Sequence, residues 1–290
     1  MIERRITVSQ SYDLMGSVRA LGVGRWDGHG WTWAADRGFG PATVRIERIG
    51  GEVAVSGWGE GAEEIVVDAE RLLGLDDTPT IEGNDDRSKA ILRDSTGIRL
   101  GATRDTHSAL VVAVLGQLVT TREAKKSLRR LVRELGPRAP GPFPDLRMFP
   151  PAHQLADLGP HDLHPFGIEA KRASTLIEVS RRGSRIREIL GMPRDEAQSR
   201  LLAVRGIGPW TAAHVMGVAY GDRDAVPMGD YHLPNAVSWA LAGEDRGDDA
   251  RMVELLEPFR PERRRMVVAI KHARVRAPRY GPRAPVRRHL

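Results

Sequence analysis

The chain has 290 residues and a formal net charge of +6, from 44 Lys and Arg against 38 Asp and Glu. It contains no cysteine, which excludes disulfides, thiolate zinc sites and iron–sulfur clusters. No apolar run approaches the roughly 18 residues of a membrane span, and no apolar core follows the charged N-terminus. We therefore expect a cytoplasmic protein without a membrane partner.

Positive charge is concentrated in two segments of the sequence. Residues 260–290 hold eleven basic side chains against one acidic side chain, a net +10, so residues 1–259 carry a net −4. A second basic cluster lies within residues 122–133. Localised positive charge suits a polyanion, with nucleic acid as the leading candidate, although a solvated helix face and a loose tail would give the same pattern.

The N-terminal part is predicted to be rich in β structure. Short alternating apolar runs are typical of strands, and Gly50-Gly51 predicts a hairpin between the last two runs. The polar, turn-rich segment 74–87 predicts a linker into a second unit. The strands are expected at 31–33, 42–49 and 52–56, and helices at 12–21 and 62–73.

After the linker the apolar spacing becomes that of helices. Residues 109–115 are almost all apolar, which predicts a helix buried on every side. Thr120 begins a capping box for the next helix, which we expect to end at Gly136. A proline-rich loop follows over 137–166. Further helices are expected at 169–182, 194–203, 209–219, 231–242, 248–257 and 261–273.

These patterns together predict an α+β fold in two parts. Residues 1–87 should form a small antiparallel sheet domain with helices, and residues 88–290 an all-helical domain. The basic segment 274–290, interrupted by prolines, is expected to be a loose tail.

The most informative segment is 201–239. A helix is predicted to end at Val204, Gly206-Ile207-Gly208 should form a tight turn, and Pro209 suits the first turn of the next helix. Two glycines allow close approach of a partner and the next helix offers free N–H groups, which are the ingredients of a phosphate site. We expect the side chain of Ile207 to pack between the two helices. A lone G-x-G is weak, whereas the string L-x-x-V-x-G-I-G-P-W-T-A is far more specific.

On this string, with VLGQLV at 114–119, Asp224 and Asp230-Tyr231, the chain resembles the helix-hairpin-helix DNA glycosylases, and among them the AlkA-type 3-methyladenine DNA glycosylases. The resemblance covers residues 98–273. It implies a monomer that binds double-stranded DNA, flips out a damaged base, an alkylated purine in the AlkA type, and hydrolyses its N-glycosidic bond in base excision repair.

The resemblance implies that Asp230 is the catalytic carboxylate, because the family carries one about twenty residues past the hairpin. An ionised carboxylate would stabilise the positive charge that builds on the deoxyribose as the bond breaks. The simpler interpretation is that Asp230 only caps the following helix. Both can hold, since a helix N-terminus favours the charged form. Asp222 and Asp224 are nearby competitors, and the resemblance implies a structural role for Asp224.

Trp210 separates two classes within the resemblance. Family members that also cut the DNA backbone place a lysine at this position, which forms a Schiff base with the sugar. An indole cannot do so. The resemblance therefore implies a monofunctional enzyme that uses water and has no AP-lyase activity.

The implied base pocket contains Trp210, His214, Tyr231 and Lys271. The first three could form an aromatic wall against which electron-poor alkylated purines stack. A core or capping role for His214 is an equal alternative. Lys271 stands where the family often has a tryptophan, so the lesion preference of this chain could differ.

Gln117 and Leu118 are implied to fill the gap that a flipped base leaves in the duplex. An ordinary core position is the alternative for Leu118. Contacts with the DNA backbone are implied for Arg205, Gly206, Ile207 and Gly208. No cofactor is expected beyond a structural monovalent cation, Na⁺ or K⁺, at three hairpin carbonyls. These carbonyls belong to Leu202, Val204 and Gly206.

Two other functions stay open at this point. The same fold could act on another lesion, such as an oxidised, deaminated or bulky-adduct base, and a panel of lesions would separate these. A non-catalytic DNA-binding protein that uses only the hairpin would show salt-sensitive binding without base release.

Overall fold

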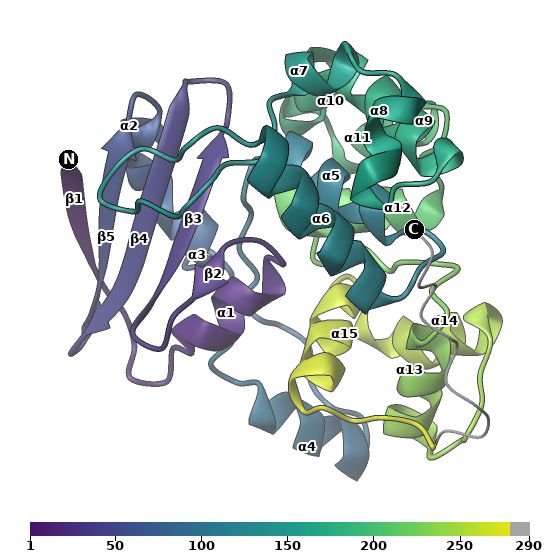
Figure 1. The fold of residues 1–290 in the computed structure, drawn as a ribbon. Coiled ribbons are helices and arrows are strands. Elements are labelled where there is room, and N and C mark those ends of the chain that lie inside the picture. The colour runs from purple at the N-terminus through teal and green to yellow at the C-terminus, as the bar shows by residue number, and fades with distance from the viewer. Residues whose placement is uncertain (279–290) are drawn as a thin grey trace.

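The computed structural model describes residues 1–278; the predicted loose tail lies outside the described residues from 279 onward. The N-terminal part is a five-stranded antiparallel sheet in the order β1-β5-β4-β3-β2 (Figure 1). Ile49 pairs with Glu52, which confirms the hairpin at Gly50-Gly51. The strands are β1 (Ile2–Thr7), β2 (Arg25–Trp26), β3 (Gly30–Asp36), β4 (Pro41–Ile49) and β5 (Glu52–Gly59).

Three short helices pack their apolar sides on this sheet: α1 (Leu14–Ala20), α2 (Ala62–Val67) and α3 (Ala69–Leu73). The core between sheet and helices includes the fully buried indoles of Trp31 and Trp33. Helix α2 lies so close to β5 that a Cβ on Gly57 would meet Val66 at 2.8 Å. The α+β expectation with an N-terminal sheet is confirmed.

A first helical core is built around α5 (Thr106–Gly116), eight of whose eleven residues are buried, as the apolar run 109–115 predicts. The capping box at Thr120 is confirmed at the start of α6. No helix within residues 1–278 is long and apolar enough to cross a membrane. The helices grouped with α5 are α6 (Thr121–Leu135), α9 (Ala170–Arg181), α10 (Gly183–Arg187), α11 (Arg194–Leu202) and α12 (Pro209–Val215), which continues into the π-helical turn η3 (Met216–Tyr220).

A second helical core joins helices from distant parts of the chain. Helix α4 (Asp86–Asp94), which the sequence patterns did not predict, contributes Ile91 to a core that it shares with the three last helices. The domain boundary expected after residue 87 falls inside α4. Those helices are α13 (Leu233–Ala242), α14 (Asp249–Leu256) and α15 (Arg263–His272), and α4 contacts α13 and α15.

The proline-rich segment 137–166 contains only short helices, as predicted: α7 (Ala152–Ala156), α8 (Pro160–Leu163) and the 3₁₀ turn η1 (His164–Phe166). Its first part crosses the sheet (Figure 1), where Phe143 meets Trp58 edge-on at 5.2 Å between ring centroids. This segment therefore connects the sheet to the first helical core.

The predicted linker is fastened to the last helix. Asp77 is fully buried and binds Arg265 of α15, with its two oxygens 2.5 and 2.7 Å from Nη2, and Arg223 at 2.8 Å. The Thr80 amide donates to Glu262 at 2.8 Å, and Glu262 pairs with Arg265. Segment 74–87 is therefore a charged junction between the sheet and α15.

Candidate active site

The helix-turn-helix unit forms as the sequence predicts. Ile207 is buried in the first helical core and its amide donates to the Val204 carbonyl at 3.0 Å, which confirms its packing between the two helices. Gly206 has a φ of +91°, and a Cβ there would meet Thr175 at 2.4 Å. A Cβ on Gly208 would meet nothing within 4 Å, so the backbone at the start of α12 is open to a partner.

Asp230 lies at the N-terminus of α13 and is held by three N–H donors. One carboxylate oxygen accepts from the amides of His232 and Leu233, both at 2.9 Å. The other accepts from the indole N–H of Trp210 at 2.9 Å. Asp230 is therefore not the N-cap residue of α13, which is His232, but its side chain holds the turn that leads into this helix and also contacts the hairpin helix.

Those donors fix the charge state of Asp230. Partial burial would raise the pKa of its carboxyl group, but the hydrogen bonds from Trp210, His232 and Leu233 and the charge of Lys271 outweigh burial and lower the pKa below its ordinary value. All three donors are uncharged. At neutral pH the site therefore holds a carboxylate whose negative charge is not cancelled by an ion pair within residues 1–278.

His214 lies one turn after Trp210 on α12, and the two rings meet edge-on with centroids 4.2 Å apart. Burial, followed by the positive charge of Lys271 and that of Arg264, lowers the pKa of His214 to about 4, although Asp230 opposes this shift. Its Nε2 atom is buried without a hydrogen-bond partner among residues 1–278. The ring is therefore neutral at physiological pH and has one nitrogen unused.

Lys271, on α15, is the third expected pocket residue that acts on Asp230. Loss of solvent around its ammonium group lowers the pKa of Lys271, and the charge of Arg264 adds to this shift, although Asp230 opposes it. Its charge in turn acts on both Asp230 and His214. Three of the four expected pocket residues, Trp210, His214 and Lys271, thus gather around Asp230.

The fourth, Tyr231, does not join them. Its side chain is 85% exposed, and its ring lies edge-on against His232 with centroids 4.8 Å apart. The two backbone bonds that hold Asp230 at the helix end turn the next residue outward. Of the three rings expected in the aromatic wall, the structure brings together Trp210 and His214, without Tyr231.

Gln117 and Leu118 follow the end of α5; the side chain of Gln117 is bonded to the hairpin, and that of Leu118 is exposed. The Gln117 amide donates inward, to the Gly206 carbonyl at 3.0 Å and to the Thr211 hydroxyl at 2.9 Å. Leu118 has a φ of +54° and is 93% exposed, so the core interpretation of this leucine is wrong. Leu118 is thus an exposed apolar side chain next to Gln117, whose hydrogen bonds hold this loop against the hairpin.

The hairpin carbonyls already have some donors. Gly206 accepts from Gln117 and Val204 accepts from the Ile207 amide, so a monovalent cation would share these oxygens. Arg205 is exposed next to them. Within residues 1–278 no cluster of His, Asp and Glu side chains is suited to a metal ion.

The neighbouring acids have structural partners. Asp224 is clamped by Arg263, whose Nε lies 2.8 Å from one oxygen and whose Nη2 lies 2.6 Å from the other. Asp222 accepts from Arg194 at 2.9 Å. These contacts support the structural role implied for Asp224 and distinguish both acids from Asp230, which has no arginine partner within residues 1–278.

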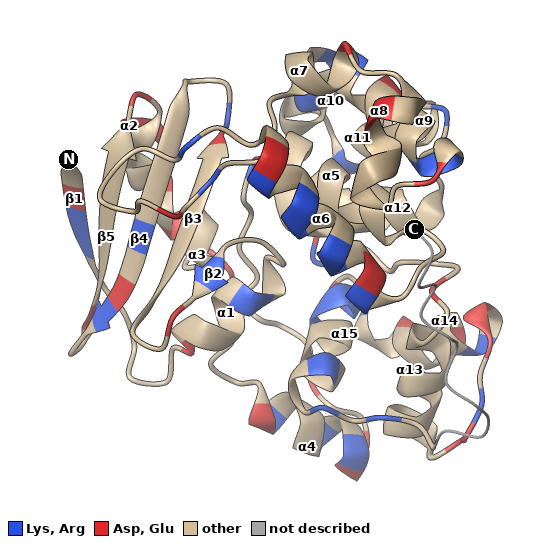
Figure 2. Cartoon of the chain, viewed as in Figure 1, with Lys and Arg blue, Asp and Glu red and all other residues tan. Residues whose placement is uncertain are grey.

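The two basic segments of the sequence lie in different environments in the folded protein. Lys and Arg bands follow α6 (Figure 2), where all but one of the six basic residues between 122 and 133 are exposed. In contrast, Arg263, Arg264 and Arg265 at the start of α15 point into the protein and are not available to a polyanion. The expectation that this whole C-terminal segment faces nucleic acid is wrong for these three residues, because buried acids and carbonyls bind them.

The position of Arg264 beside the candidate site was missed by the sequence analysis. Its guanidinium would collide with a Cβ on Gly217, in the turn that continues α12. The only available signal was a glycine inside a predicted helix.

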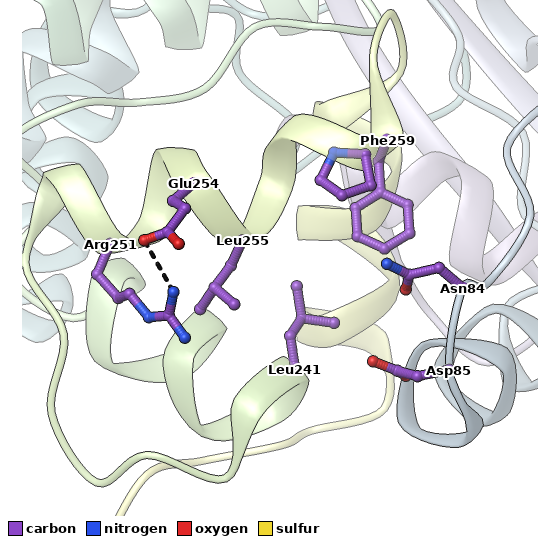
Figure 3. A pocket seen from close by; sticks show the side chains of 8 residues that line it. Asn84, Asp85, Leu241, Arg251, Glu254, Leu255 and Phe259 are labelled. Carbon is purple, nitrogen blue, oxygen red and sulfur yellow. Dashed lines mark ion pairs between the residues drawn. The ribbon is translucent and has the colours of Figure 1, made fainter.

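Two cavities lie away from this group. One, of about 120 Å³, is bordered by Arg251, Glu254 and Asn84 (Figure 3), and its charges are already paired, with Arg251 2.8 Å from Glu254 and 2.7 Å from Glu244. The other, of about 280 Å³, lies between the sheet and the first helical core near Arg37 and Arg187. Neither includes a predicted site residue.

Relatives by sequence carry DNA repair names. A DNA-3-methyladenine glycosylase of Bacillus subtilis is 30% identical over 183 residues, 60% of this chain and 60% of the relative. The "Probable bifunctional transcriptional activator/DNA repair enzyme AlkA" of Mycobacterium tuberculosis is 32% identical over 168 residues, 56% of this chain and 34% of the relative. The chain thus spans less than two thirds of these relatives. No protein-family model matches it.

Solved structures share the fold over almost the whole chain. A 3-methyladenine DNA glycosylase from Archaeoglobus fulgidus has a TM-score of 0.75 at 17% identity, over 92% of this chain and 96% of that one. An 8-oxoguanine glycosylase/lyase of Clostridium acetobutylicum has a TM-score of 0.72 at 16% identity, over 94% and 97%. Sequence and fold together confirm the resemblance to helix-hairpin-helix glycosylases of the AlkA type.

Proposed function

We propose that this chain is a monofunctional DNA glycosylase that binds duplex DNA, flips out a damaged purine and hydrolyses its N-glycosidic bond. The observation that carries the proposal is the state of Asp230. Its carboxylate is fixed by Trp210 and two backbone amides, all neutral, at the end of a helix that faces the hairpin. A structural carboxylate would be expected to have its charge paired, as Asp224 does.

The chemistry follows from that charge. As the bond between C1′ and the base breaks, positive charge develops on the deoxyribose. A carboxylate of lowered pKa is ionised at neutral pH and stabilises this charge, and because its donors already hold it in place, little reorganisation is needed. The base leaves with the electron pair of this bond, and water attacks C1′ and releases a proton, which an uncharged base takes up as it leaves and a cationic alkylated base does not need.

The absence of lyase activity is proposed from Trp210. A Schiff base needs a lysine amine at the sugar, and an indole occupies the hairpin position beside Asp230. Lys271 is the only lysine for which an electrostatic interaction with Asp230 is resolved within residues 1–278, and it approaches from α15. Borohydride trapping therefore tests this part directly.

DNA contacts are proposed for two exposed features. The open backbone at Gly208 and the exposed Arg205 suit a phosphate, with a monovalent cation at the hairpin carbonyls as an additional bridge. Leu118 is an exposed apolar side chain that could enter the duplex in place of the flipped base. Gln117 would act by holding this loop against the hairpin rather than by touching DNA.

The sequence relatives named for 3-methyladenine support an alkylated purine as the lesion. The experiment is base release from methylated duplex DNA, with identification of the released bases. Asp230→Asn should lower the release rate by about 10²–10³-fold, the scale for losing a key electrostatic stabiliser.

Asp222→Asn is a control for loss of a neighbouring acid, and borohydride added to the same reactions should trap no enzyme–DNA adduct. Release by Asp230→Asn at the native rate would refute the assignment. DNA binding with no release from any lesion would support the non-catalytic alternative instead.

A further inference from the structure

Helix α15, which carries Arg264 and Lys271, packs against the segment formed by α12 and η3. The Arg264 amide, at the start of α15, donates to the Arg223 carbonyl at 2.9 Å, just beyond the turn that ends the α12 segment. The Arg264 guanidinium packs on Gly217 of that turn. The chain of α15 therefore starts where the α12 segment ends and continues from there toward Lys271.

The spacing along the two helices places Lys271 near the aromatic pair. Arg264 and Lys271 are seven residues apart, about two helical turns, so they share one face of α15. Trp210 precedes Gly217 by the same interval. The charge of Lys271 acts on Asp230 and on His214, in agreement with this placement.

The charges of this group do not cancel on the side of the base. Within residues 1–278, neither Lys271 nor Arg264 has a carboxylate oxygen within 4 Å, and Nη1 of Arg264 is buried without a partner. His214 is neutral, with a free ring nitrogen. Asp222 and Asp77 act on the charge of Arg264, whereas Asp230 is the only acid within residues 1–278 for which an interaction with Lys271 is resolved. If Asp230 faces the sugar, Lys271 makes the part of the site beyond it positive.

Resting on the proposed function, we propose that Lys271 stabilises the departing base and thereby shifts the preference of the enzyme, among the purine lesions that it releases, from cationic methylated bases toward uncharged ones. When the C1′–N bond breaks, its electron pair stays on the base. An uncharged base leaves as an anion, which an ammonium group stabilises, whereas a cationic alkylated base leaves as a neutral molecule and is repelled beforehand. Lys271 keeps its proton: the base anion takes up one proton, and the attacking water releases one.

The test uses two duplexes, one with a single hypoxanthine, which is uncharged, and one with a single 7-methylguanine, whose imidazolium ring is cationic. Base release is measured at saturating enzyme. The wild-type protein should favour hypoxanthine. Lys271→Met should lower hypoxanthine release by about 10²-fold and leave 7-methylguanine release unchanged or faster, while Lys271→Arg, which keeps the charge, should retain the preference.

Lys89→Met, at an exposed lysine of α4, is the matched control. Equal loss of both activities in Lys271→Met would overturn the inference, because it would indicate a role in folding or DNA binding. A wild-type preference for 7-methylguanine would overturn it as well while leaving the proposed glycosylase intact. Release of neither base, nor of any other lesion, would instead count against the proposed function.

Discussion

Asp224 and Asp230 lie six residues apart in the segment between η3 and α13, and they have different kinds of partner. Asp224 is buried and gripped at both oxygens by the Arg263 guanidinium, with Arg194 at 3.8 Å. Asp230 is less buried and is held by an indole and two amides. Both have a lowered pKa, after burial is overcome by their partners. The difference is that neutral donors leave a carboxylate its net charge, whereas an arginine cancels it.

The largest expected difference is in stability. Asp224→Asn breaks a buried ion pair and should lower the free energy of unfolding by about 3 kcal/mol, whereas Asp230→Asn should change it by about 1 kcal/mol or less, since the asparagine oxygen can still accept the two amides. Urea unfolding measures both, and base release per folded molecule should show the reverse order. Equal destabilisation by the two substitutions would contradict the proposed difference between the paired and the unpaired carboxylate.

The neutral ring beside Asp230 makes a prediction on pH. The pKa of His214 falls from 6.5 to about 4 on folding, first because of burial. Between these values the unfolded chain binds a proton that the folded ring rejects, so the free energy of unfolding falls as pH drops from about 6.5 to about 4, by up to about 3 kcal/mol.

His214→Gln should remove this part of the pH dependence in urea unfolding at pH 7, 6 and 5. His161→Gln, at an exposed histidine, should not. Identical pH profiles for wild type and His214→Gln would contradict the neutral assignment.

Trp210→Phe sharpens the contrast by removing one neutral donor. We expect base release to slow by about 10-fold, the scale of one hydrogen bond to a charged group. Because that bond lowers the pKa of Asp230, the acidic limb of the pH–rate profile should also shift to higher pH. A slower rate with an unshifted limb would mean that the indole acts only by packing.

Much of this arrangement could be predicted from local sequence. The capping box at Thr120, the buried run in α5 and the turn around Ile207 each depend on neighbouring residues, and all three formed. The roles predicted for Asp230 and Asp224 depend instead on the resemblance to the glycosylase family, because no local pattern distinguishes a catalytic aspartate from a structural one.

Other features depend on contacts that no local pattern encodes. Tyr231 turns outward because Asp230 bonds the two amides beyond it. Gln117 points inward because Gly206, far along the chain, offers a carbonyl. Helix α4 is stabilised by helices that follow it by well over a hundred residues, and a basic run gave no sign that Arg264 would be buried.

The salt-bridged aspartate in segment 74–87 has a consequence for how the protein can be divided. Asp77 supplies the counter-charge of Arg265 and Arg223, and the Ala20 carbonyl binds Arg264. Cutting the chain at the boundary expected after residue 87 would separate these guanidinium groups from Asp77 and Ala20 and leave them at a newly opened surface of the helix that carries Lys271. The helical part is therefore not an autonomous module, and we expect the isolated C-terminal fragment to misplace Lys271 even where its own hairpin folds.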